Sequence, residues 1–169
     1  PSIAYPVLLA EIGGTNCRLS LATDPESPHR HLARIGTGSY PTPEAAFESV
    51  IATLPERPLS AILAVAGPLD GRSAQLTNAI WQFDGPRIAG ALKLNQGLLV
   101  NDFEALAASL AVLNPGCVET LAAGRPEAEG VKLVLGPGTG FGASALLTRG
   151  ERGFLIPTEA GHIGIGPED

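Results

Sequence analysis

One stretch of the sequence reads Leu8-Leu9-Ala10-Glu11-Ile12-Gly13-Gly14-Thr15-Asn16-Cys17-Arg18-Leu19-Ser20-Leu21-Ala22. In it, two apolar runs flank a Gly-Gly-Thr-Asn turn, a pattern typical of a β-hairpin. The adjacent glycines permit positive φ and leave backbone amide hydrogens unshielded by side chains, which suits the close approach of an anion. We therefore predict a hairpin over residues 8–22 with a phosphate-binding tip.

The same pattern returns in the stretch Lys132-Leu133-Val134-Leu135-Gly136-Pro137-Gly138-Thr139-Gly140-Phe141-Gly142-Ala143-Ser144-Ala145-Leu146-Leu147. One glycine hairpin alone carries little information, because tight turns need glycine for structural reasons. Here a threonine directly follows glycine in both copies, as Thr15 and as Thr139. The repeat indicates a duplicated phosphate-binding element.

Length, composition and charge bound the class of protein. A chain of 169 residues is near the size of one domain and long enough for a hydrophobic core. Apolar residues make up 44%, yet no uncharged apolar run approaches the roughly 20 residues of a membrane span. The net charge of −6 argues against nucleic acid as a partner, so a bound anion has to be held by local backbone amides.

The two cysteines, Cys17 and Cys117, are far apart in the sequence and lack a metal-binding spacing. Free thiols in a reducing compartment are the simplest interpretation, with a disulfide as the alternative. The free thiols and the lack of an apolar span predict a cytoplasmic protein without a membrane partner, and the negative charge predicts no nucleic-acid partner.

Apolar periodicity predicts strands that alternate with helices. Thr42 is a candidate N-cap for a helix that starts at Pro43. That helix separates two apolar strands, and this spacing predicts a crossover into a partly parallel sheet. A second helix over 85–94 is expected to turn Ile88, Ala91 and Leu92 inward. The predicted strands cover 7–11, 19–22, 29–35, 61–66, 73–77 and 98–100, and a third helix covers 103–112.

The composition changes after residue 112. A helix-breaking Asn114-Pro115-Gly116 sequence precedes residues 122–130, which are rich in Ala, Gly, Pro and Glu. We therefore predict an N-terminal α/β domain over 1–112 that holds the first hairpin and Asp102. Residues 113–169 then begin a second domain with the second hairpin, and they are too few for a complete α/β unit.

Asp102 is the leading candidate for a catalytic group. It follows an apolar strand and opens a helix, and ligands of open α/β sheets gather at the carboxyl ends of strands. A carboxylate there can accept a proton from a substrate hydroxyl as a general base. An ordinary helix N-cap explains the same position equally well.

Two further segments carry side chains suited to a sugar. Asn78 follows a predicted strand and can hydrogen-bond a sugar hydroxyl, although a turn asparagine explains it equally well. Trp81 after it can pack on an apolar sugar face or lie in the core. Glu159 and His162 share a glycine-flanked segment, where hydroxyl recognition is favoured over metal binding and a structural turn is the alternative. Neither a GxxxxGK[ST] loop nor a Rossmann GxGxxG sequence with its acidic partner occurs, which disfavours those two nucleotide folds.

Six short motifs occur in the order found in bacterial glucokinases. They are Glu11-Ile12-Gly13-Gly14-Thr15-Asn16, Ala66-Gly67-Pro68, Thr77-Asn78-x-x-Trp81, Asn101-Asp102-Phe103-Glu104-Ala105, Gly136-Pro137-Gly138-Thr139-Gly140-Phe141-Gly142 and Glu159-Ala160-Gly161-His162. Over essentially its whole length the sequence therefore resembles the ATP-dependent glucokinase family of the actin-like ATPase superfamily. The resemblance implies an α/β fold of the ribonuclease-H-like (actin-like ATPase) type, with a mixed sheet, flanking helices and two domains, the second incomplete. It also implies a kinase of glycolysis with glucose bound in a cleft.

The resemblance assigns roles to residues of this chain. It implies that Asp102 accepts the proton of the sugar 6-hydroxyl while that oxygen attacks the γ-phosphorus of ATP. The residues implied to contact the sugar are Asn78, Asn101, Asp102, Glu159 and His162. The residues implied to bind ATP lie in the two hairpins and are Glu11, Gly13, Gly14, Thr15, Asn16, Gly138, Thr139 and Gly140.

Glu11 is the candidate ligand of Mg²⁺, the cofactor that the resemblance implies beside ATP. It stands where family members usually carry aspartate, so its carboxylate reaches one methylene farther toward the metal or its bound water. Ala160 likewise replaces the commoner glycine of the last motif. The implied partners are glucose and ATP, and a second copy of the chain in a homodimer is a further candidate.

Three interpretations follow from these features. The first is the N-terminal half of a glucokinase or close sugar kinase. The second is a short chain that keeps a sugar-facing cleft without kinase activity. The third is a sugar-sensing regulator or acyl-phosphate kinase on the same scaffold, although the Asn-Asp and Glu-x-x-His motifs fit a neutral sugar better than a carboxylate substrate.

Overall fold

A computed structural model describes residues 2–76, 81–125, 127, 129–137, 141–150 and 152–158. The chain forms two compact units, Pro1–Asp102 and Phe103–Asp169. This division lies ahead of the predicted boundary near residue 112, because Phe103 already contacts the second hairpin. The extent of the two predicted domains, 1–112 and 113–169, stays a prediction.

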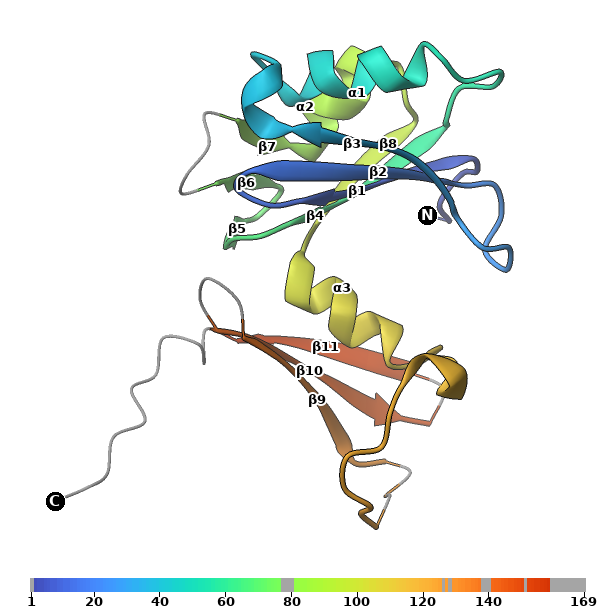
Figure 1. Ribbon diagram of the computed structural model, residues 1–169, viewed down its shortest axis with the longest axis vertical. Helices are drawn as coiled ribbons and strands as arrows, with labels where there is room; N and C mark the ends of the chain where they lie inside the picture. Colours follow the sequence, from blue (N-terminus) through green and yellow to red (C-terminus); the bar gives the residue numbers. More distant parts are fainter. Residues whose placement is uncertain are drawn as a thin grey trace, which may run out of the picture. The chain divides into compact units, whose positions relative to one another are not determined.

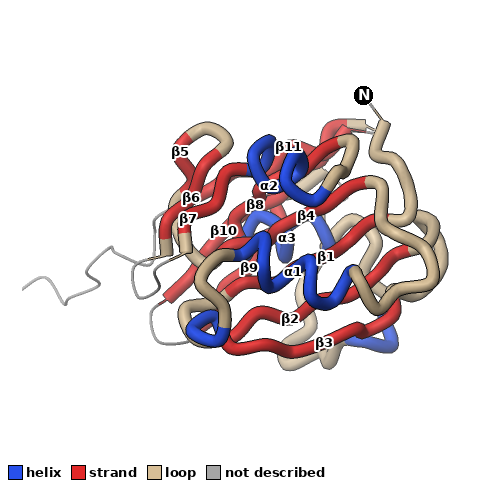
Figure 2. The backbone as a smooth tube through the Cα atoms, turned by 90° about the horizontal axis from the view of Figure 1, so that it is seen from above, coloured by secondary structure: helices blue, strands red, loops and turns tan. Residues whose placement is uncertain are grey.

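The first unit is built on a five-stranded mixed sheet with the strand order β3-β2-β1-β4-β8 (Figures 1 and 2). The β1–β2 and β2–β3 pairs are antiparallel, whereas the β1–β4 and β4–β8 pairs are parallel. The predicted first hairpin and the predicted crossover are therefore both confirmed. The strands are β1 (Val7–Ile12), β2 (Asn16–Ala22), β3 (Arg30–Gly36), β4 (Ser60–Val65) and β8 (Gln96–Asn101).

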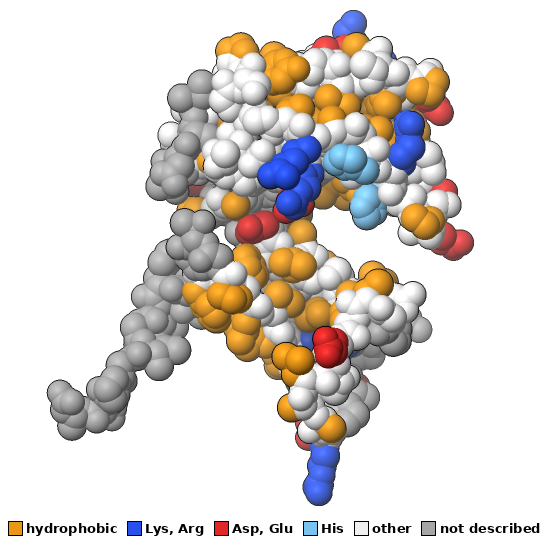
Figure 3. Space-filling model, in the orientation of Figure 1, with side chains coloured by type: hydrophobic (Ala, Val, Ile, Leu, Met, Phe, Trp, Pro, Cys, Tyr) orange, Lys and Arg blue, Asp and Glu red, His pale blue; other side chains and the backbone are white. Residues whose placement is uncertain are grey.

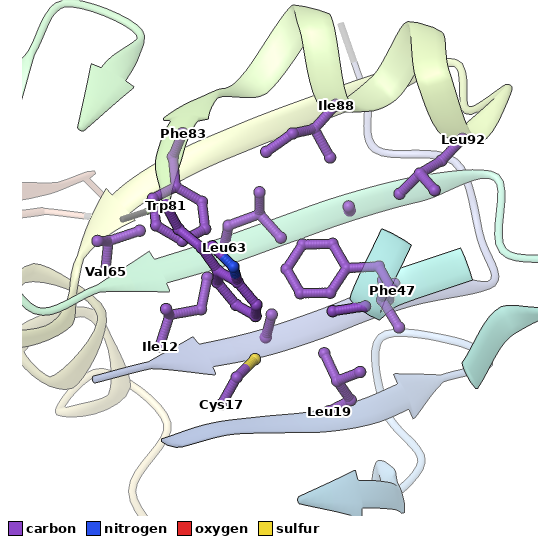
Figure 4. Close-up of a cluster of buried hydrophobic side chains, with 14 of the residues drawn as sticks. Ile12, Cys17, Leu19, Phe47, Leu63, Val65, Trp81, Phe83, Ile88 and Leu92 are labelled. Carbon is purple, nitrogen blue, oxygen red and sulfur yellow. The ribbon is translucent and has the colours of Figure 1, made fainter. Parts of the chain in front are cut away.

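Two helices, α1 (Pro43–Ile51) and α2 (Gly85–Leu92), cover one face of this sheet (Figures 1 and 4). As predicted, Thr42 is the N-cap of α1, and its hydroxyl oxygen accepts from the Ala45 amide at 3.2 Å. The N-cap of α2 is Asp84, whose carboxylate accepts a first-turn amide in the same way. Both helices therefore begin where a short polar side chain satisfies an otherwise unpaired amide.

The core lies between the sheet and these helices, and aromatic rings fill its centre (Figure 4). Trp81 is 1% exposed and meets Phe47 and Phe83 edge to face, with ring centroids 6.4 and 6.1 Å apart. Its indole N–H donates to the Tyr40 carbonyl at 2.9 Å. Trp81 is therefore a core residue, and the alternative that it packs on a sugar is wrong.

Burial along α2 differs from the prediction at one position. Ile88 and Leu92 are buried as predicted, but Ala91 is exposed and Ala89 lies in the core instead. The buried positions of α2, which also include Gly85, follow the i, i+3, i+4, i+7 spacing of one helical face. Ala91 falls outside that face.

The helix α2 and the sheet approach each other closely at two glycines. A Cβ at Gly85 would overlap the Gly97 carbonyl in β8, and a Cβ at Gly97 would lie 3.2 Å from the Gly85 carbonyl carbon. The two backbones therefore touch directly, which a side chain on either residue would prevent.

The first unit also contains a small antiparallel sheet and a 3-10 turn. The sheet has the order β5-β6-β7, with β5 (Leu69–Asp70), β6 (Ser73–Gln75) and β7 (Gln82–Asp84). The strand predicted over 73–77 is thus present as the shorter β6. The 3-10 turn η1 (Thr37–Ser39) directly follows β3 and returns the chain toward the first hairpin.

The helix α3 (Asp102–Ser109) leads into the second unit. It ends before residue 112, where the prediction placed its end, and Leu110, Ala111 and Val112 make turn-type bonds to carbonyls three residues back. Within the described residues, no helix combines the length and the apolar character that crossing a membrane requires. A second 3-10 turn, η2 (Pro115–Cys117), follows α3.

The second unit contains a three-stranded antiparallel sheet with the order β11-β10-β9 (Figure 1). Its strands are β9 (Val131–Pro137), β10 (Phe141–Arg149) and β11 (Arg152–Thr158), so the predicted second hairpin is confirmed. The middle strand carries the buried residues, but apolar side chains of the outer strands are exposed over this sheet (Figure 3). Residues exposed by 41–56% are Leu133, Leu135, Phe154, Leu155 and Ile156.

Candidate functional site

The carboxyl ends of three parallel strands lie side by side in the first sheet. Ile12 at the end of β1 pairs with Val65 at the end of β4, and Val65 pairs with Asn101 at the end of β8. Neighbouring strands are about 4.8 Å apart, so β1 and β8 end roughly 10 Å from each other. The first hairpin tip and Asp102 thus share one edge of the sheet, where open α/β sheets bind ligands.

The tip of the first hairpin is a short turn from Gly13 to Asn16. The Gly13 amide donates to the Asn16 carbonyl at 2.9 Å and closes the turn. Gly14 and Thr15 at its end are exposed. Thr37 in η1 is only 4% exposed, and its hydroxyl and amide donate to the Gly14 and Thr15 carbonyls at 2.9 and 3.0 Å. The tip is therefore held by η1 while its outermost residues stay exposed.

Glu11, the candidate metal ligand, forms an ion pair at the base of this tip. It pairs with Arg18 across the hairpin, and Arg18 Nη1 donates to both carboxylate oxygens at 2.9 Å. The side chains of Glu11 and Arg18 are 61% and 54% exposed. Because neighbouring Ala10 and Ile12 face the core, this pair lies on the sheet face opposite α1 and α2.

Asn101 and Asp102 are the last residue of β8 and the first residue of α3. The Asn101 side-chain amide donates to the Gly67 carbonyl at 3.0 Å, which ties the end of β8 to the loop after β4. Both residues are half-buried. The candidate base therefore lies at the sheet edge rather than within the core.

Phe103, which follows Asp102, contacts the base of the second hairpin. Gly136 in β9 and Gly142 in β10 are cross-strand partners, and the Phe103 ring lies against both. A Cβ at Gly136 would come within 2.6 Å of the ring atom Cζ, and a Cβ at Gly142 would overlap the ring. These two glycines are therefore required for aromatic packing, independently of any role of the tip.

Part of the predicted site falls on residues beyond those that the structure describes. They are the second tip, Gly138, Thr139 and Gly140, and the sugar-binding candidates Asn78, Glu159 and His162. Their roles stay predictions from the resemblance. The described candidates that lie together at the carboxyl edge of the first sheet are Glu11, Gly13, Gly14, Thr15, Asn16, Asn101 and Asp102.

Cys17, directly after the tip, is unsuited to nucleophilic catalysis. It is fully buried, and this burial, with a smaller contribution from the Glu11 charge, raises the pKa of the thiol to about 12. The thiol therefore stays protonated at neutral pH. Cys117 is exposed, and both cysteines are free, so the interpretation as free thiols is confirmed.

The described residues contain no group of three or more His, Cys, Asp or Glu side chains that could hold a metal ion. A nucleotide-bound Mg²⁺ needs fewer protein ligands than such a group supplies, since one or two carboxylates commonly hold it together with phosphate oxygens and water. Glu11 offers such an oxygen donor beside the tip, and direct coordination would require it to share its carboxylate with Arg18. The donor chemistry therefore fits a nucleotide-bound Mg²⁺ with one protein carboxylate.

Two residues of this region were missed by reasoning from the sequence, Arg18 and Thr37. The pairing of Arg18 with Glu11 could have been predicted from the sequence, because a hairpin with its tip at 13–16 makes these two residues of opposite charge cross-strand neighbours. Nothing in the sequence indicates the contact of Thr37 with the tip, since Thr37 lies 23 residues from Gly14 and belongs to no motif.

Comparison with known protein families shows the family to which the chain belongs. The family model described as Glucokinase matches residues 8–169. The chain belongs to the glucokinase family. The match includes all six motifs that carried the resemblance.

Curated glucokinases match nearly all of this chain. The glucokinase of Agrobacterium fabrum (strain C58 / ATCC 33970) is 37% identical over 166 residues, which cover 98% of this chain and 49% of the relative. The glucokinase of Sinorhizobium medicae (strain WSM419) is 38% identical over 167 residues, with coverage of 98% and 49%. The chain therefore spans about half the length of the curated relatives it matches.

Solved glucokinase structures share the fold. The glucokinase from an Antarctic psychrotroph superposes with a TM-score of 0.85 at 30% identity, covering 97% of this chain and 53% of that chain. A ROK family glucokinase from Streptomyces griseus, solved in complex with glucose and AMPPNP, superposes with a TM-score of 0.64 at 19% identity, covering 96% and 51%. The predicted ribonuclease-H-like (actin-like ATPase) α/β fold with a mixed sheet is therefore confirmed.

Proposed function

We propose that the protein containing this chain is a glucokinase that transfers the γ-phosphoryl group of ATP to the 6-hydroxyl of glucose. The observation that carries the proposal is the glucokinase family match over residues 8–169. The glucokinase of Balamuthia mandrillaris was solved with glucose, and that of Streptomyces griseus with glucose and AMPPNP, which supports this choice of substrates.

We assign phosphate binding to the two hairpin tips. Phosphoryl transfer depends mainly on positioning and charge compensation. A chain with a net charge of −6 offers a triphosphate no general attraction, so the compensation has to be local. In the first tip, exposed Gly14 and Thr15 supply backbone donors, and Arg18 adds a cation at the base. The remaining proposed contacts are Gly13, Asn16, Gly138, Thr139 and Gly140.

Asp102 is the proposed general base. It lies at the same sheet edge as the first tip, so a sugar bound there can approach both a carboxylate and a phosphate. Its carboxylate would accept the proton of the 6-hydroxyl while that oxygen bonds to the γ-phosphorus and ADP leaves. The residues proposed to hydrogen-bond the other sugar hydroxyls are Asn78, Asn101, Glu159 and His162.

Mg²⁺ is the proposed cofactor. If Mg²⁺ is bound with ATP, part of the charge on the transferred phosphoryl group would be neutralised by it. Glu11 is the proposed protein ligand, and Arg18 orients its carboxylate through two hydrogen bonds. Because glutamate reaches one methylene farther than aspartate, the carboxylate of Glu11 would displace the ion or a water bound to it from the position that an aspartate would set.

The proposal includes the organisation and setting of the protein. Residues 1–112 would be the small domain and 113–169 the start of the large one. Because the curated relatives are about twice as long, we propose that the 169-residue chain alone lacks kinase activity. Sugar binding without phosphorylation is the second candidate function for that chain. The longer protein would act in cytoplasmic glycolysis as a homodimer, without a nucleic-acid or membrane partner.

A coupled assay of glucose phosphorylation tests the proposed reaction in the full-length protein. With ATP and Mg²⁺, the wild type should form glucose 6-phosphate and ADP. Asp102→Asn should lower kcat by about 10²–10⁴-fold, the range typical of a general base, without abolishing glucose binding. Asp24→Asn, in an exposed turn, is the matched control and should keep full activity.

The outcomes separate the candidate functions. Wild-type protein that phosphorylates no glucose would overturn the proposal, and unchanged turnover in Asp102→Asn would remove the base assignment. Calorimetry with glucose on the 169-residue chain tests the second candidate, which requires binding without turnover. Light scattering measures whether the full-length protein is a dimer.

A further inference from the structure

We infer that Thr37 is a positioning residue for the first hairpin tip, because its two hydrogen bonds orient the amide groups of that tip toward a nucleotide. The inference rests on the proposed function, since it deepens the assignment of residues 13–16 to phosphate binding. Thr37 lies in η1, outside the six motifs that carry the family resemblance.

The contacts of Thr37 with the tip are specific. Its hydroxyl donates to the Gly14 carbonyl at 2.9 Å, and its amide donates to the Thr15 carbonyl at 3.0 Å. Thr37 is 4% exposed, so the donor side of both bonds is shielded from water, while the acceptor residues Gly14 and Thr15 are exposed. One residue therefore engages the oxygens of two successive peptide groups in an otherwise exposed turn.

These two bonds determine where the amide hydrogens of the tip point. In a planar trans peptide, the C=O and N–H groups point in opposite directions. Among the described residues, a cis peptide occurs only between Tyr5 and Pro6, so the peptides of the tip are trans. With the Gly14 and Thr15 carbonyls directed at Thr37, the amide hydrogens of Thr15 and Asn16 point away from Thr37.

This orientation suits the binding of an anion. The two carbonyl oxygens, which would repel a phosphate, are turned toward donors, and the amide hydrogens are presented on the opposite side. Without the hydroxyl, the Gly14 carbonyl loses its partner, and the adjacent glycines allow that peptide to rotate. Thr37 therefore preorganises the tip before the nucleotide arrives.

The hydrogen bond of the Thr37 hydroxyl joins two distant segments, whereas that of another threonine in the first unit stays within one segment. Thr53, after α1, donates from its hydroxyl to the Val50 carbonyl at 2.7 Å, which is a contact within a single helix end. The two threonines thus make the same type of bond, but only that of Thr37 reaches the hairpin tip. Thr53→Val is therefore the matched control for Thr37→Val.

The test uses the full-length protein with Thr37→Val, Thr37→Ser and Thr53→Val. Valine keeps the size of threonine and removes the hydroxyl, whereas serine retains it. Thr37→Val should raise the KM of ATP and the calorimetric Kd of ADP by about three- to tenfold, the value of one hydrogen bond, with the Kd of glucose unchanged. Thr37→Ser and Thr53→Val should bind ADP like the wild type.

Each outcome decides the inference. Unchanged ADP affinity in Thr37→Val overturns it, as does an equal loss of ADP and glucose affinity, which indicates general damage. If Thr37→Val does not fold, Thr37→Ala removes the same hydroxyl and is measured in its place. Wild-type protein that binds ADP but phosphorylates no glucose contradicts the proposed function alone, and the ADP affinities of the variants still decide the role of Thr37. Wild-type protein that binds no ADP contradicts both.

Discussion

The two glycine–threonine hairpins share a turn sequence and differ in what supports the turn. In each hairpin, the second cross-strand pair counted from the tip can be compared. This pair is Glu11–Arg18 in the first hairpin and Gly136–Gly142 in the second. An ion pair therefore stands at the base of the first tip, whereas the Phe103 ring lies against the glycines of the second. The same glycine–threonine turn sequence thus stands on a polar support in one hairpin and on an aromatic support in the other.

The hairpins also differ in burial. β1 lies inside the five-stranded sheet between β2 and β4, and the inward side chains of the first hairpin, such as Leu8 and Leu19, are fully buried. In the second hairpin, Leu133 and Leu135 of β9 are 56% and 55% exposed. Because buried apolar area drives folding, the first hairpin contributes more to the stability of the 169-residue chain.

The largest expected effect comes from truncating one leucine in each hairpin of the 169-residue chain. Leu19→Ala should lower the free energy of unfolding by about 2–5 kcal/mol, because it opens a cavity at a fully buried position. Leu133→Ala should lower it by less than about 1 kcal/mol, because that side chain already meets water. Urea denaturation measures both, with Trp81 fluorescence reporting the first unit and circular dichroism reporting both sheets. Equal losses would contradict the comparison.

A smaller effect is expected from crowding the aromatic support of the second hairpin. Gly142→Ala should lower the free energy of unfolding by about 1–3 kcal/mol, because its Cβ would overlap the Phe103 ring. Gly124→Ala is the control, since no atom lies within 4 Å of a Cβ there. Adding Phe103→Leu to Gly142→Ala should recover part of the loss. If Gly142→Ala unfolds at the same urea concentration as the control, the ring contact does not constrain this hairpin.

The ionic support of the first hairpin should matter for binding more than for stability. Arg18→Gln should change the free energy of unfolding by less than about 1 kcal/mol, because exposed ion pairs contribute little. In the full-length protein it should weaken ADP binding about tenfold, the value of one charge-assisted hydrogen bond. Arg34→Gln, on the neighbouring strand β3, is the control for general charge. Equal loss of ADP affinity in both variants would indicate a field effect instead.

The smallest expected effect is a difference in thiol reactivity between Cys17 in the first unit and Cys117 in the second. At pH 8, a thiol reagent should label Cys117, which is exposed, and spare Cys17, which is buried with a pKa of about 12. Denaturation should expose the second thiol. Because the pKa of Cys17 rises from 9.0 to about 12 on folding, its contribution to stability is complete below pH 9 and is lost as the pH rises toward 12. Labelling of both thiols in the native chain would contradict this.

Elements that depend on local patterns were predicted from the sequence. Both hairpins, the Thr42 cap of α1 and the crossover to a parallel β4 follow from turn residues and apolar periodicity within short windows. The position of Asp102 at a strand end was predictable for the same reason. Ala91 was not, because the choice of buried face in a short, partly apolar helix depends on where the sheet lies.

The support of the tips could not be predicted, because it joins segments that are distant in the sequence. The bond from Thr37 to Gly14 spans 23 residues, and the contact of Phe103 with Gly136 depends on how a helix and a hairpin fold together. Composition also could not place Trp81 in the core rather than at a sugar, since an indole suits both environments. Its burial in the folded unit decides between them.

The backbone contact between Gly85 and Gly97 links the proposed base to a remote helix. Gly97 lies in the strand that ends at Asn101, roughly 16 Å from Asp102 along an extended chain. A bulkier residue at Gly85 would push that strand aside and displace Asn101 and Asp102 with it. A genetic screen for inactive variants should therefore recover substitutions at both glycines, and heritable loss of function can arise at positions that no substrate reaches.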